Sequence, residues 1–247
     1  AASRPVFNGS GGGSFFGTNL MSRLILFPLF AAIAATSLYG DALSPLKTTN
    51  FTPGWQQYET GLQQMGSGKL KEAEDSFKAS LAADPHRMEA LVGLAELATF
   101  RKDFKTAEDY LGKALADKPN NLGLLLTSGR IRVIQNKLPD AEAFFKKASA
   151  VSPQAIGPYV DLGDLYALKM HKSDQALKAY RQALAIDDKS VALHYRTALA
   201  LADQNMAPAA IAEMQRAMAL QPKEDKDPQI ALDLGRMYLS QKQYKLS

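Results

Sequence analysis

Alanine, a large apolar residue, a small residue and proline recur along this chain in one fixed frame. The frame is carried by Ala73, Phe77, Ser80 and Pro85, then by Ala107, Leu111, Ala114 and Pro119, then by Ala141, Phe145, Ala148 and Pro153. Successive alanines are spaced by 107 − 73 = 34 and 141 − 107 = 34 residues. A fixed period of this length predicts a solenoid, because each unit cannot bury its own apolar face and must stack on a copy of itself.

A small residue twelve positions before each alanine extends the frame upstream, at Gly61, Ala95 and Gly129. Two helices of each unit should therefore meet where neither has a bulky side chain. The pattern resembles the tetratricopeptide repeat (TPR) family, with a small residue at position 8, alanine at 20, an aromatic residue or Leu at 24, a small residue at 27 and proline at 32. The resemblance implies an all-α fold, a right-handed superhelix of stacked helix hairpins.

The resemblance covers residues 54–247 and divides them into five near-complete repeats and a truncated sixth. The repeats begin at Gly54, Met88, Leu122, Ile156, Val191 and Pro228. The fourth repeat departs from the pattern, because its alanine falls one place late at Ala176 and Asp188 stands where proline is expected. We expect a one-residue insertion in its inter-helix turn, around residues 169–173.

Periodicity supports the helical interpretation independently of the family. Residues 69–85 and 104–119 carry apolar side chains at spacings of three and four, with Lys and Glu on the other face, and both segments end at proline. Each is expected to form an amphipathic helix.

Residues 21–42 have the pattern of a signal peptide. Met21 and Arg23 precede an uncharged apolar run over residues 24–40, which becomes rich in small residues near its end. The alternative is an uncleaved membrane anchor, although the run is shorter than about 20 residues and contains proline. In both cases the repeats are expected outside the cytoplasm, in a bacterial periplasm or secreted, with membrane contact only through an uncleaved N-terminal segment.

Two further segments flank this one. Residues 1–20 include a Gly/Ser-rich run and no Met, and we expect a flexible, non-native upstream stretch there. Residues 43–53 are expected to form a polar linker before the repeats.

No pattern of catalytic chemistry is present in the sequence. His86, His171 and His194 are far apart, and none has a second His at metal-ligand spacing. The sequence also contains no glycine-rich phosphate loop followed by Lys and no Gly-x-Ser-x-Gly elbow. We therefore expect no enzymatic activity, no metal and no cofactor.

The net charge argues against a nucleic-acid partner. It is +4 for the whole chain, and Arg4 and Arg23 are the only charged residues of the first 40, so the rest of the chain carries 4 − 2 = +2. The repeat region is therefore nearly balanced, its Lys and Arg residues are scattered along the sequence, and a nucleic-acid partner is not expected.

The resemblance implies a protein or peptide partner, bound in a concave groove lined by the first helix of each repeat. The implied contacts are Tyr58, Val92, Leu126, Val160 and Tyr195 at position 5, and Leu62, Glu96, Arg130, Asp164 and Leu199 at position 9. An apolar row beside charges of alternating sign would match an amphipathic helix or peptide. The Lys and Asn of the family's clamp for chaperone tails are missing at these positions in the first three repeats, so a chaperone co-factor is not expected.

Two interpretations of the charged row remain open. Glu96, Arg130 and Asp164 either contact the partner or pair with one another across adjacent helices. Leu126 is expected to be exposed, so that Leu126→Asp would abolish partner capture without unfolding the array.

The sequence thus predicts a non-enzymatic protein–protein interaction scaffold of the bacterial envelope. The alternative is the TPR arm of a larger machine or enzyme, for example in exopolysaccharide export, whose functional domain follows residue 247. The sixth repeat ends barely into its second helix, which would leave an apolar face bare. Further chain or self-association through this uncapped C-terminal repeat is expected to cover it.

Overall fold

The computed structural model describes residues 52–222, 224 and 226–244. The expected upstream stretch, the signal peptide and most of the linker lie outside these residues. Within them the chain is helical and contains no strand. The helices are α3 (Trp55–Gly66), α4 (Leu70–Ala83), α5 (Met88–Phe100), α6 (Phe104–Asp117), α7 (Leu122–Ile134), α8 (Leu138–Val151), α9 (Ile156–Asp164) with η1 (Leu165–Lys169), α10 (Ser173–Ile186), α11 (Val191–Asp203), α12 (Ala207–Leu220) and α13 (Pro228–Tyr244).

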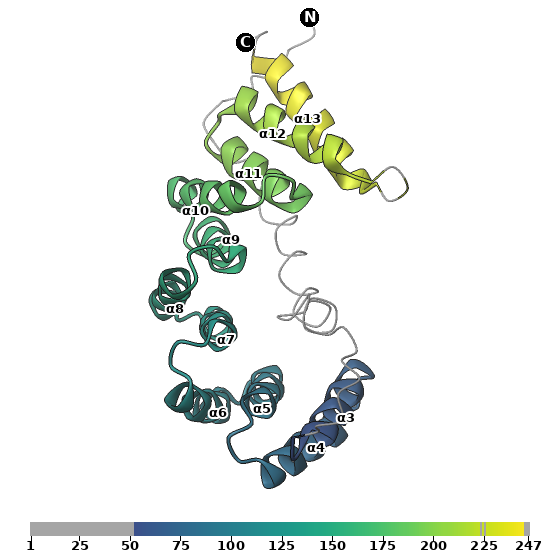
Figure 1. Ribbon diagram of the computed structural model, residues 1–247. Coiled ribbons are helices and arrows are strands. Elements are labelled where there is room, and N and C mark those ends of the chain that lie inside the picture. Colours follow the sequence, from purple (N-terminus) through teal and green to yellow (C-terminus); the bar gives the residue numbers. More distant parts are fainter. Residues whose placement is uncertain (1–51, 223, 225, 245–247) are drawn as a thin grey trace, which may run out of the picture.

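Each odd-numbered helix from α3 to α11 packs against the helix that follows it, and the resulting hairpins stack in sequence. Figure 1 shows a curved array, with α5, α7 and α9 along its inside and α6, α8 and α10 along its outside. The inner helices start at the expected repeat starts from Met88 to Pro228, and one residue after the expected start at Gly54. The all-α solenoid predicted from the sequence is therefore confirmed.

The repeated alanine of each second helix is completely buried. It has no exposed surface in any of the five repeats, at Ala73, Ala107, Ala141, Ala176 and Ala210. The large residue four positions later is also buried, at Phe77, Leu111, Phe145, Tyr180 and Met214. Because both positions lie on one face of each second helix, the sequence frame is the core of the protein.

The size of the small residue in the first helix follows the size of the side chain that it faces. A Cβ added to Gly129 would lie 2.3 Å from Phe145, and one added to Gly163 would lie 2.2 Å from Tyr180. In the second repeat, where the large residue is Leu111, the small residue is Ala95. Aromatic rings therefore occur where a missing methyl group makes room for them.

The turn inside each repeat is closed by a residue in the left-handed conformation. Its φ is +74° at Gly68, +61° at Lys102, +59° at Asn136, +52° at His171 and +58° at Asn205. Each lies two residues before the next helix, so all five turns have the same length. A residue in this conformation reverses the chain direction, so that the amide groups that follow the helix donate to free carbonyl groups of its last turn.

The extra residue of the fourth repeat lies in its first helix and not in its turn. Eight positions separate Gly163 from the left-handed His171, whereas seven separate Gly129 from Asn136. The difference is absorbed by η1, a π-helical turn in which the amide of Met170 donates to the carbonyl of Leu165 at 3.1 Å. Our expectation of an insertion at 169–173 was wrong, because a wider helical turn accommodates one residue without loss of hydrogen bonds.

Candidate functional site

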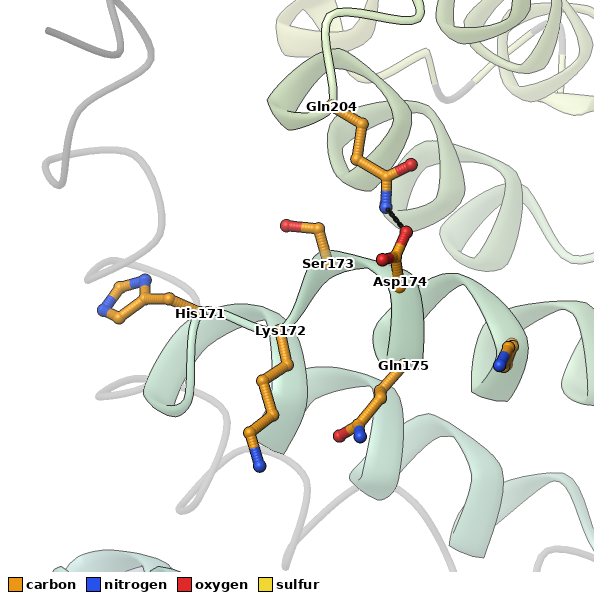
Figure 2. Close-up of a pocket in the computed structure, with 7 residues that line it drawn as sticks. His171, Lys172, Ser173, Asp174, Gln175 and Gln204 are labelled. Carbon is orange, nitrogen blue, oxygen red and sulfur yellow. Dashed lines mark hydrogen bonds between the residues drawn. The ribbon is translucent and has the colours of Figure 1, made fainter.

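A shallow depression on the described surface lies at the turn between η1 and α10. It has a volume of about 600 Å³ and is lined by His171, Lys172, Ser173, Asp174, Gln175, Lys178 and Gln204. Figure 2 shows that His171, Lys172 and Ser173 point in different directions, whereas Asp174 accepts a hydrogen bond from Gln204 Nε2 at 2.9 Å. A catalytic site needs several groups that converge on one point, and this depression does not supply them.

Metal-binding and membrane-spanning features are both absent from the described part of the chain. It contains no group of three or more His, Cys, Asp or Glu side chains placed to hold a metal ion. None of its helices is long and apolar enough to cross a membrane.

All ten residues expected to contact a partner lie on inner helices, but their exposure differs. Tyr58, Val92, Val160 and Tyr195 are partly buried, and Leu62 is 37% exposed. We use the term inner face for a set of eight exposed or partly exposed side chains of α3, α5, α7 and α9. They are Leu62, Val92, Glu96, Phe100, Arg130, Ile134, Val160 and Asp164.

Leu126 and Leu199 are buried, contrary to our expectation. Their side chains are only 4% and 8% exposed. Leu126 packs against the next inner helix at Gly157, where an added Cβ would lie 3.2 Å from Leu126 Cδ1. Because this leucine fills the contact between two repeats, it is part of the core, and the expectation that Leu126→Asp would leave the fold intact is wrong.

Two ion pairs connect successive inner helices. Arg130 Nε lies 3.0 Å from Asp161 Oδ2, and Arg196 Nε lies 3.0 Å from Asp164 Oδ1. Each pair joins position 9 of one repeat to position 6 of the next. Pairing of Glu96, Arg130 and Asp164 with one another, one of the two interpretations left open by the sequence, is not observed, because Arg130 and Asp164 pair with Asp161 and Arg196.

Sequence reasoning missed the partners Asp161 and Arg196. The available signal was the spacing, because a charge at position 9 is followed 31 or 32 residues later by the opposite charge. The acidic residue of each pair is also held by the packing around it. The hydroxyl of Tyr180 donates to Asp164 at 2.8 Å, and burial raises the pKa of Asp161 to about 6 despite the opposing effect of Arg130.

Glu96 occupies position 9 of the second repeat and lacks such a partner. The residue at position 6 of the next repeat is Thr127, which is buried and uncharged. Glu96 forms no ion pair or hydrogen bond with another described side chain, and burial raises the pKa of its carboxyl to about 7, although the nearby charge of Arg130 opposes the shift. It is thus a partly buried carboxyl group with unused hydrogen-bonding capacity.

Two large apolar side chains are exposed one helical turn beyond these charges. Phe100 follows Glu96 by four residues and is 55% exposed, and Ile134 follows Arg130 by four residues and is 43% exposed. Residues four apart share one face of a helix, so each lies beside its charged neighbour. Sequence reasoning missed both, because it considered contacts only at positions 5 and 9 of each repeat, and these two residues stand at position 13.

Comparisons with known proteins agree with this architecture. The tetratricopeptide repeat model matches residues 58–121 and 165–225. A TPR protein of Thermus thermophilus, TTC0263, is 22% identical with a TM-score of 0.57, over 75% of this chain and 99% of its own. Pseudomonas aeruginosa pilF is 19% identical with a TM-score of 0.63, over 76% of this chain and 85% of its own.

A third structure of similar fold is YrrB, described as a TPR protein with an unusual peptide-binding site. It is 17% identical with a TM-score of 0.54, over 74% of this chain and 92% of its own. No curated protein is similar enough in sequence to match the chain. At these identities the structures establish the shared fold.

Proposed function

Because the chain belongs to the tetratricopeptide repeat family, whose members are scaffolds for protein or peptide partners, we propose that it binds a peptide segment of a partner protein on its inner face. The observation that carries this proposal is the exposure of Phe100 and Ile134, which are 34 residues apart in sequence (134 − 100) at the same position of adjacent repeats. Large apolar side chains at equivalent positions provide a row of anchors for a bound segment.

The surroundings of the two anchor residues suit a bound segment that has both apolar and polar side chains. Val92 and Val160 add partly buried apolar surface, and the ion pairs at Arg130 and Asp164 add polar groups that fix orientation more than they add affinity. An extended peptide or an amphipathic helix lying across α3 to α9 would contact both kinds of surface.

A peptide selection tests the proposal. We expect the full chain to enrich binders from a library of random short peptides, and their affinity to fall about tenfold or more in Phe100→Ser/Ile134→Ser, since both anchors are lost. The matched control is Val151→Ser/Met218→Ser, which removes apolar side chains of 39% and 41% exposure from the outer helices α8 and α12. Binders that tolerate the inner-face change as well as the control would move the site elsewhere.

We further propose that the protein works in the bacterial envelope. The support is the sequence of residues 21–42, with its basic start, apolar run and small residues. Expression from Met21 in a bacterium with an intact export pathway should yield a mature chain that starts between residues 38 and 43. An intact mass that retains residues 21–40 would indicate an anchored protein, and a full-length cytoplasmic chain would contradict export.

Self-association through the last repeat stays a prediction. Its surface would be the exposed apolar side chains of α13, namely Leu232, Tyr238 and Leu239, which are 50%, 44% and 66% exposed.

A further inference from the structure

The first two inner helices carry only negative charge. The charged residues of α3 and α5 are Glu59, Glu89 and Glu96, and neither helix contains Lys or Arg. None of the three carboxylates forms an ion pair or hydrogen bond with another described side chain. The two helices contact each other, and Glu96 is the carboxyl group of this helix pair that belongs to the inner face as defined above.

The ion pairs of the inner face explain why the negative charge is left over at this end. Arg130 at position 9 of the third repeat pairs with Asp161 at position 6 of the fourth. Asp164 at position 9 of the fourth repeat pairs with Arg196 at position 6 of the fifth. At the junction of α5 and α7 the corresponding contact would join Glu96 to Thr127, and no counter-charge is supplied. Arg130, the nearest cation, already donates its Nε hydrogen to Asp161.

We infer that the segment bound on the inner face is cationic, and that a Lys or Arg side chain of the partner binds Glu96 while apolar neighbours in the partner contact Leu62 and Phe100. This inference rests on the proposed function and names the chemistry of its partner. The occupant is a basic, amphipathic peptide segment.

The chemistry of Glu96 favours this occupant over an acidic or neutral one. An ammonium or guanidinium group would supply the hydrogen-bond donors that the carboxylate lacks, in charge-assisted bonds that are stronger than neutral ones. Apolar surface at Val92 and Phe100, four residues before and after Glu96, would exclude water from those bonds. An acidic peptide would be repelled by Glu96, which has no counter-charge among the described side chains that it contacts.

The peptide selection also tests this inference, through the charge of the peptides that it enriches. The enriched peptides should be rich in Lys or Arg next to apolar residues, and Glu96→Gln should weaken their binding about tenfold or more, since one charge-assisted contact is lost. The control is Glu72→Gln on the outer helix α4, which makes the same change in net charge and should alter binding less than about twofold.

A stability measurement distinguishes loss of the binding site from unfolding of the Glu96→Gln variant. Burial raises the pKa of Glu96 from 4.5 to about 7, so the stability that the protonated carboxyl retains is lost as the pH rises between these two values, and the full cost of ionisation is present at pH 8. Gln cannot ionise, so the melting temperature of Glu96→Gln at pH 8 should equal or exceed that of the unchanged protein. Lost binding with a retained melting temperature therefore reports the site.

The outcomes separate this inference from the function on which it rests. Acidic or neutral binders, or basic binders unaffected by Glu96→Gln, would overturn the cationic partner, while loss of binding in Phe100→Ser/Ile134→Ser would still support the inner face. Binders unaffected by both changes would overturn both proposals. Failure to enrich any peptide from the library would count against both as well.

Discussion

Leu126→Asp is expected to destabilise the array by about 3 to 5 kcal/mol, because it places an unpaired carboxylate in a closed apolar contact. Leu126 is 4% exposed and packs against α9 at Gly157, so neither water nor a cation can reach the new charge without separation of the third and fourth repeats. In a solenoid each repeat contacts only its neighbours, so loss of one junction should split the unfolding transition into two. Urea denaturation followed by circular dichroism would measure both effects.

The matched control is Leu62→Asp, which makes the same substitution on the inner face of α3. Leu62 is 37% exposed, so the charge can stay hydrated and the cost should be below about 1 kcal/mol. If Leu126→Asp unfolded at the same urea concentration as the unchanged protein, the junction between α7 and α9 would not be packed as described.

Gly129→Ala is expected to destabilise the protein by about 1 to 3 kcal/mol, although alanine is the better helix former by about 1 kcal/mol. The added Cβ would lie 2.3 Å from the ring of Phe145, which is 1% exposed and therefore enclosed by other atoms. The overpacking should outweigh the gain in helix propensity. Chemical denaturation of the variant would give the difference in the free energy of unfolding.

Two companion variants isolate the cause. Gly112→Ala, at an exposed helical glycine with no atom near the added Cβ, should stabilise the protein by about 0.5 to 1 kcal/mol. Adding Phe145→Leu to Gly129→Ala recreates the Ala95 and Leu111 pair of the second repeat and should recover part of the loss. Stabilisation by Gly129→Ala alone would show that the two helices do not meet at this residue.

The stacking of hairpins was predictable because several copies of one pattern report the same contacts. Ala73, Ala107 and Ala141 share one position, and one explanation, a close approach of two helices, accounts for all of them. The first residues of the inner helices followed from the same frame. The fold depends on what the repeats have in common, and a single sequence contains that information several times over.

The details that were missed depend on what the repeats do not share. The burial of Leu126 depends on the next repeat having glycine at residue 157, and the pairing of Arg130 depends on residue 161. Both are contacts across a junction, which a position-by-position reading of one repeat does not reveal. The insertion in the fourth repeat was noticed but misplaced, because the sequence shows that a residue has been added and does not show that a π-helical turn can hold it.

The two ion pairs of the inner face also specify the order in which the repeats stack. Their polarity reverses along the array, from Arg130 with Asp161 to Asp164 with Arg196. If the third repeat stacked directly on the fifth, Arg130 would face Arg196, and a fourth repeat stacked on another fourth would bring Asp164 against Asp161. Each wrong neighbour would bury part of two like charges, so these pairs disfavour assemblies in which a repeat is skipped or stacked on its own copy, in a protein whose repeats otherwise share one pattern.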